Sequence, residues 1–161
     1  PAMLLTAILL IQYWRTNYKL MRKFLTHSKL NKFFLIFGIG SAIFLILHSI
    51  FLGIKFDYTL YKLFRRFILL AFILFELAAQ AFFVKNLFII KNQINKLINK
   101  KILIAKIILV SLLIIVAIIT LPIVVSPGNV HFKHALEWNY FVGIISFYLL
   151  THLFWKDKIK N

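Results

Sequence analysis

The segment 131–140, with the sequence His-Phe-Lys-His-Ala-Leu-Glu-Trp-Asn-Tyr, gathers several side chains that could do chemistry. His131 and His134 are three residues apart, and Glu137 follows at the same spacing, so the three share one face of a helix. Histidine and carboxylate ligands at helical spacing can hold zinc. The segment lacks an HExxH pattern, and Lys133 lies between the two histidines. We therefore expect no resident cofactor and keep zinc at these three residues as the alternative.

A second group of polar residues lies inside apolar runs. Glu76 and Gln80 are four residues apart near the middle of one run, and therefore share a helix face. An acid at the bilayer centre costs about 3 kcal/mol on insertion scales, so Glu76 should face the bundle interior and be protonated or partnered. The pair either ties helices together or binds a ligand, a proton or a headgroup. We predict a ligand-binding set of these two residues with His48, Glu137 and Trp138.

The composition defines the class of protein. Of 161 residues, 62% are hydrophobic and the mean hydropathy is +0.91, so the chain is expected to be an integral membrane protein. Twenty Lys and Arg against four Asp and Glu give a formal charge of +16. Because these cations separate the apolar runs, they are expected to set topology and contact lipid headgroups, with no nucleic-acid partner. The absence of cysteine excludes disulfides, thiolate metal sites and cysteine nucleophiles.

The apolar runs predict an all-α fold, a polytopic transmembrane helix bundle that forms one domain over residues 1–161. A bilayer needs about 20 apolar residues per helix, and the first run is shorter than that. We therefore expect five visible helices of which the first is incomplete, its start and anything before it being missing. The predicted spans cover residues 1–14 in part, 33–54, 67–90, 102–125 and 135–155.

Basic residues are distributed unequally between alternate loops. Residues 15–32 carry six, residues 91–101 carry four and the C-terminal tail carries three, against five on the opposite side. The positive-inside rule therefore predicts that both loops and the C-terminus are cytoplasmic. Trp14 is expected in an aromatic belt, and the Lys106 ammonium is expected to extend outward to the membrane surface. Gly38, Gly40 and Ser41 form one small face, which predicts a close approach of another helix.

Three short elements resemble the Frag1/DRAM/Sfk1 family of multi-pass membrane proteins. They are the sequence Ala-Leu-Glu-Trp at residues 135–138, the sequence His-Ser-Ile-Phe at residues 48–51, and Gln80. The resemblance implies six helices in the full protein and a role in membrane lipid handling. It also implies that Glu137 and Trp138 are the signature pair, without a catalytic role. The ending of the first complete span departs from the Asn-Phe-Gln type expected for that family.

The function expected from the residues and the resemblance is lipid binding or lipid handling, with membrane lipids as partners. Other membrane proteins or further copies of the chain are possible partners as well. One alternative is a zinc-dependent membrane lipid hydrolase, similar to alkaline ceramidases and the progestin and adiponectin receptor group. His48 and the loop residue Asp57 would then join the residues of segment 131–137, although the intramembrane aspartates of those families are absent. Another alternative is an accessory subunit of a larger membrane complex.

Overall fold

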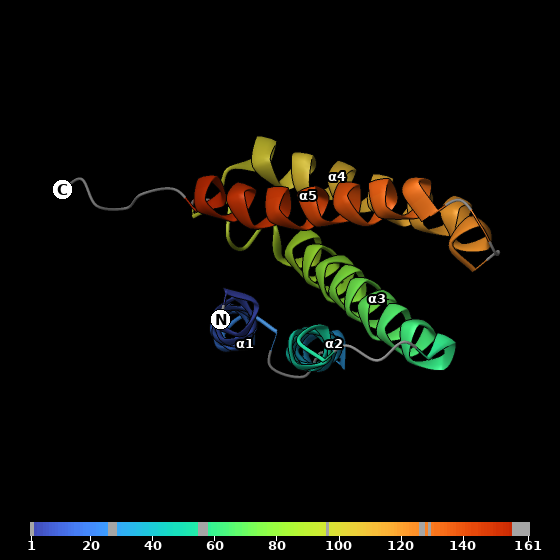
Figure 1. The fold of residues 1–161 in the computed structure, drawn as a ribbon. Helices are drawn as coiled ribbons and strands as arrows, with labels where there is room; N and C mark the ends of the chain where they lie inside the picture. The colour runs from blue at the N-terminus through green and yellow to red at the C-terminus, as the bar shows by residue number, and fades with distance from the viewer. Residues whose placement is uncertain are drawn as a thin grey trace. The chain divides into compact units, whose positions relative to one another are not determined.

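The computed structural model describes residues 2–25, 29–54, 58–95, 97–125, 128 and 130–155. Over these residues the chain forms five α-helices, shown in Figure 1. They are α1 (Ala2–Arg22), α2 (Lys29–Leu52), α3 (Thr59–Ile90), α4 (Lys100–Val125) and α5 (Val130–Phe154). The prediction of an all-α helix bundle is confirmed.

Three helices among the described residues are long and apolar enough to cross a membrane. They are Lys29–Leu52, Thr59–Ile90 and Lys100–Thr120, which overlap the predicted second, third and fourth spans. The chain is therefore a membrane protein with transmembrane helices. The predicted spans at residues 1–14 and 135–155 are helical in α1 and α5, and their crossing of the membrane stays a prediction.

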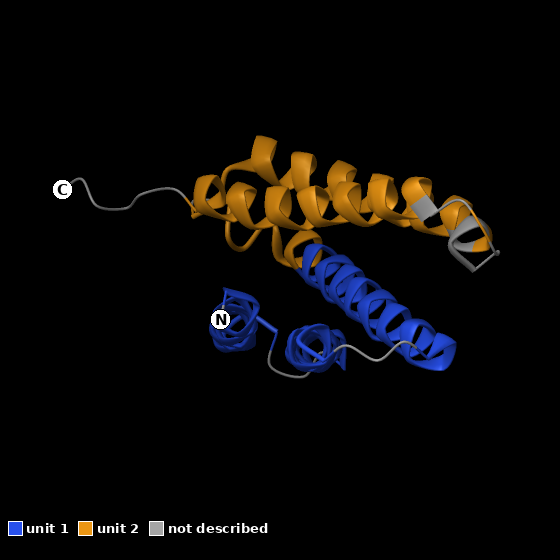
Figure 2. Ribbon diagram, in the orientation of Figure 1, with its two compact units in different colours: residues 1–86 blue, residues 87–161 orange. Residues whose placement is uncertain are grey.

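The chain divides into two compact units, residues 1–86 and residues 87–161 (Figure 2). Unit 1 contains α1, α2 and most of α3, whereas unit 2 contains α4 and α5. Each unit is described by itself below. The prediction of one domain over the whole chain stays a prediction.

Two helices extend beyond the predicted membrane spans. The run 1–14 continues as a helix to Arg22, and α3 begins at Thr59, eight residues before the predicted start of its span. Charged residues end a membrane span because of their desolvation cost, but lysine and arginine are good helix formers. Much of the predicted loop 15–32 and the pair Arg65 and Arg66 are therefore helical.

In unit 1, α2 and α3 pack antiparallel through a ladder of aromatic rings. Ring centroids lie 5.7 Å apart for Phe33 and Phe82, and 5.0 Å apart for Phe44 and Phe75. Farther along the two helices, the ring centroid of Phe51 on α2 lies 5.2 Å from that of Phe64 and 6.4 Å from that of Tyr61, both on α3. Aromatic pairs at these separations contribute about 0.5–1.5 kcal/mol each beyond their buried area. The ladder fixes the register in which polar residues of the two helices meet.

Helix α1 packs on α2 through Trp14, which is fully buried. Its ring centroid lies 5.9 Å from that of Phe34 and 5.8 Å from that of Phe83, and the indole lies directly over Gly38. The indole is enclosed because the missing side chain of Gly38 leaves room for it, and the aromatic-belt position of Trp14 stays a prediction. The close approach predicted for the small face of α2 is confirmed on a second side by Phe75, which lies over Gly40.

In unit 2, α4 and α5 lie side by side (Figure 1). The Asn99 side chain accepts a hydrogen bond at 3.1 Å from the Lys101 backbone N–H and so caps the start of α4. Leu113 packs over Gly143, and its carbonyl accepts a hydrogen bond from Tyr140 at 3.4 Å. These contacts hold α5 against α4 and fix which side chains of the two helices meet.

Candidate functional site

Glu76 and Gln80 lie together on α3, as their spacing predicts, and both are fully buried. Gln80 Nε2 donates to Glu76 Oε1 at 3.2 Å. The other carboxyl oxygen, Oε2, lies 2.6 Å from the hydroxyl of Ser41 on α2, which is also fully buried. The sequence had indicated Ser41 only as part of a small face. The carboxyl thus joins the two helices inside unit 1.

The hydrogen bonds around Ser41 restrict the state of the carboxyl. Its hydroxyl has one proton but lies within hydrogen-bonding distance of two acceptors, Glu76 Oε2 at 2.6 Å and the carbonyl of Gly38 at 2.8 Å. Both contacts are hydrogen bonds at once when a neutral Glu76 donates to Ser41 and Ser41 donates to Gly38. Because the three side chains are fully buried, this network can join the two helices and hold a proton.

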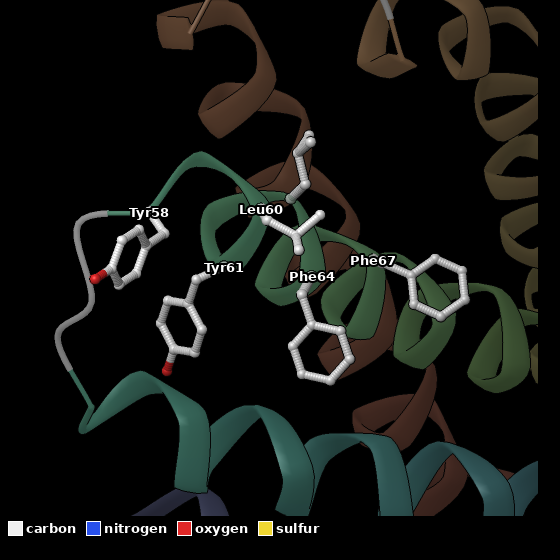
Figure 3. Close-up of a pocket in the computed structure, with 6 residues that line it drawn as sticks. Tyr58, Leu60, Tyr61, Phe64 and Phe67 are labelled. Carbon is white, nitrogen blue, oxygen red and sulfur yellow. The ribbon is translucent and has the colours of Figure 1, made fainter.

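An open site lies elsewhere in unit 1, at the start of α3. It is an apolar groove of about 780 Å³ lined by Tyr58, Leu60, Tyr61, Leu63, Phe64 and Phe67, five of which are labelled in Figure 3. The Tyr61 hydroxyl donates toward the carbonyl of Phe51 in the last turn of α2 and toward that of Ile54 just after this helix, and so holds the end of α2 against the start of α3. A volume in this range is typical of small-molecule sites.

His48 lies close to this groove along α2. It precedes Phe51 by three residues, one helical turn, and the Phe51 ring contacts the groove residue Phe64 at 5.2 Å. The His48 side chain is half-buried. Two members of the predicted ligand-binding set can thus be compared by their place along the helices of unit 1. His48 is one turn from Phe51, which contacts the groove, whereas Glu76 is nine residues beyond Phe67, the last lining residue on α3.

Glu137 and Trp138 belong to the other unit, on α5. His134 Nδ1 lies 3.2 Å from Glu137 Oε2, three residues on, so this part of the predicted helical face exists. Trp138 is 69% exposed and contacts Phe141 edge-on at 6.3 Å. Among the described residues, no three His, Cys, Asp or Glu side chains converge as a metal site. Zinc at His131, His134 and Glu137 stays a prediction, and Asp57 lies outside the described residues.

Lys106 of α4 was expected to extend toward the membrane surface, and this expectation was wrong. Its side chain is fully buried against α5, where Nζ donates to Thr151 Oγ1 at 2.6 Å. Nζ also lies 4.2 Å from the ring centroid of Phe147 and 5.3 Å from that of Phe154. Cation–π contacts and a hydroxyl acceptor offset the loss of water around the ammonium. No acid lies three or four residues from Lys106 in the sequence, so nothing there had indicated that its side chain is buried.

We expect Thr151→Val to destabilise the protein by about 1–3 kcal/mol, because it removes the acceptor of a buried ammonium. Lys106→Met should leave the melting temperature unchanged or raise it, since Thr151 keeps its own hydrogen bond to the Phe147 carbonyl at 3.1 Å. Thermal unfolding in detergent measures both. Thr6→Val is the control, because the exposed Thr6 hydroxyl donates only to a carbonyl of its own helix. A larger loss for Lys106→Met than for Thr151→Val would contradict this account.

The comparisons with known proteins give no relative from which roles could be transferred. No family model, curated protein or solved structure matches this chain.

Proposed function

We propose that this membrane protein binds an anionic phospholipid, with an acyl chain in the apolar groove at the start of α3. The observation that carries the proposal is the groove itself, which is open and is lined by aliphatic and aromatic side chains. In a membrane such a groove is filled by hydrocarbon, since no other abundant group there matches its surface. The resemblance of segments 48–51 and 135–138 to a lipid-handling family supports the same function.

The charge at this end of α3 favours an anionic headgroup. The first turn of α3 contains no acid, and the peptide N–H groups at a helix N-terminus attract anions. Lys62 and Arg66 are exposed on the first two turns, next to the lining residues, and their long side chains extend to the headgroup region. An apolar groove beside the cations Lys62 and Arg66 is complementary to a phospholipid with a net negative headgroup.

The proposed orientation follows from the distribution of basic residues. The helical and loop residues between Arg15 and Lys32 carry six cations, and all six are exposed. We place this end of unit 1, with residues 91–101 and the C-terminus, in the cytoplasm. The groove then lies in the outer leaflet, where a cysteine introduced at the exposed Tyr58 should react with a membrane-impermeant maleimide added to intact cells.

We expect filling the groove to release the bound lipid. Leu60→Trp combined with Leu63→Trp places two large rings in the groove, whereas Ile118→Trp adds a ring to an exposed position of α4. Native mass spectrometry of protein taken from mixed phosphatidylglycerol and phosphatidylcholine membranes counts the retained lipids. The wild type and Ile118→Trp should each retain one phosphatidylglycerol, and the groove variant should lose it at least tenfold.

The headgroup preference is a separate expected result. Lys62→Gln with Arg66→Gln should keep one lipid bound but reduce the preference for phosphatidylglycerol over phosphatidylcholine about threefold or more, because each exposed charge near an anionic surface contributes roughly 1 kcal/mol. Equal lipid retention by the wild type and by the variant with the filled groove would overturn the proposal.

A further inference from the structure

Three asparagines of unit 1 share one layer, each a single turn from the aromatic contact of Trp14, Phe34 and Phe83. The ring centroids of Phe34 on α2 and Phe83 on α3 lie 5.5 Å apart. Seven residues later on α2 and seven residues earlier on α3, Ser41 is hydrogen-bonded to Glu76. In this antiparallel register Asn31, three residues before Phe34, lies opposite Asn86, three residues after Phe83. On α1, Asn17 follows Trp14 by three residues, and Trp14 contacts Phe34. All three asparagines thus extend from the same side of the aromatic contact. We call them the asparagine layer.

The asparagine layer is buried. Asn17 is 7% exposed, Asn31 is 3% exposed and Asn86 is fully buried. Asn17 Nδ2 donates to the carbonyl of Tyr13 at 2.9 Å. In contrast, three side-chain atoms have no hydrogen-bond partner among the described residues, namely Asn86 Oδ1, Asn86 Nδ2 and Asn31 Oδ1. A buried amide group without a partner costs about 1–3 kcal/mol, so a further molecule that completed the hydrogen bonds of these two side chains would stabilise unit 1.

We propose that the asparagine layer binds an uncharged hydroxyl group, either water or the alcohol of a neutral lipid such as a diacylglycerol. The open atoms comprise two acceptors, Oδ1 of Asn31 and of Asn86, and one donor, Asn86 Nδ2. A hydroxyl oxygen can donate to an amide oxygen and accept from the amide N–H at the same time. A water molecule in a buried site likewise needs two to four polar partners.

Charge excludes the ionic alternatives. A cation would suit the two amide oxygens, but the residues around this end of unit 1, including Lys29, Lys32 and Lys85, are basic and exposed. An anion would suit the basic surroundings, but it would face two open oxygens and a single open donor group. A neutral group with both donor and acceptor capacity satisfies the layer without a Born cost. This assignment depends on the packing of unit 1 and not on the proposed lipid in the groove.

Magnetisation transfer to the side-chain amide protons, measured by solid-state NMR, tests the proposal on the full chain. The protein is uniformly labelled with ¹⁵N and placed in bilayers of perdeuterated phosphatidylcholine, first alone and then with protonated diacylglycerol. The Asn86 signal is identified by its loss in Asn86→Ala, or by its shift in Asn86→Gln if the first variant does not fold. The exposed Asn95 is the positive control for water, and the buried backbone N–H of Ala42 is the negative control.

Transfer from water to Asn86 at no less than one third of the Asn95 intensity supports the proposal with water as the ligand. Transfer from the glycerol C–H protons in the second sample supports it with the lipid alcohol as the ligand. Transfer only from other protein side chains, such as Asn31, would overturn it, because the amides would then complete one another directly. Absence of transfer from water, lipid and amides alike would overturn it as well.

Discussion

Gly38→Leu is expected to separate α1 from α2 and to destabilise unit 1 by about 3 kcal/mol or more. Even a Cβ at this position would overlap the ring of Trp14, which is fully buried and packs between α2 and α3. Overpacking a closely packed contact usually costs about 1–3 kcal/mol, and here the larger Leu side chain must displace an entire indole. Thermal unfolding in detergent, together with a red shift of Trp14 fluorescence in a background with Trp138→Phe and Trp155→Phe, measures the effect.

Gly53→Leu is the matched control for this substitution. A Cβ at Gly53 would have only the Ile50 carbonyl oxygen as a neighbour, at 3.6 Å, so the same change should alter stability by less than about 0.5 kcal/mol. If Gly38→Leu melted with the wild type and kept the Trp14 emission of the wild type, α1 would not dock on α2 as described.

Glu76→Ala is expected to cost about 2 kcal/mol or more, whereas Glu76→Gln should be nearly neutral. Alanine removes the acceptor of Gln80 Nε2 and leaves a void between two helices. A glutamine amide, in contrast, donates to Ser41 Oγ as the neutral carboxyl does, and its oxygen accepts from Gln80. Ser41 keeps its hydrogen bond to the Gly38 carbonyl in both cases. Unfolding of both variants in the same detergent gives the comparison.

Glu76→Lys and Glu137→Gln are the variants expected to be the most and the least destabilising of this series. A lysine inside the network brings an unpaired charge and more volume, so the variant should not yield folded protein. Glu137 is partly exposed and pairs with an exposed His134, so its amide should be tolerated. If Glu76→Gln lost as much stability as Glu76→Ala, the network would contain an ionised carboxylate, and the assignment of hydrogens would be wrong.

The sequence predicted those features that depend on one helix alone. The number of helices followed from the apolar runs, and the Glu76 and Gln80 pair followed from a spacing of four residues and from its depth. The small face of α2 around Gly38 was predicted as a close contact, which it is. In each case the determinant lies within about one turn of helix, so local periodicity contains it.

Features that depend on the register between helices could not be predicted. Helices α2 and α4 are apolar on nearly every side, so no amphipathic face indicates which side chains meet a neighbour. The Ser41 contact with Glu76 and the burial of Lys106 against Thr151 are set by that register.

The most direct test of the proposed lipid site is to map where a photoreactive lipid attaches. Phosphatidylglycerol with a diazirine on one acyl chain is illuminated with the protein in bilayers, and the labelled peptides are sequenced by mass spectrometry. We expect labelling to concentrate on Leu60, Leu63, Phe64 and Phe67, and to fall at least fivefold when unlabelled phosphatidylglycerol is in excess. Labelling spread evenly over the exposed faces of α3 and α4, with no competition, would contradict specific lipid binding.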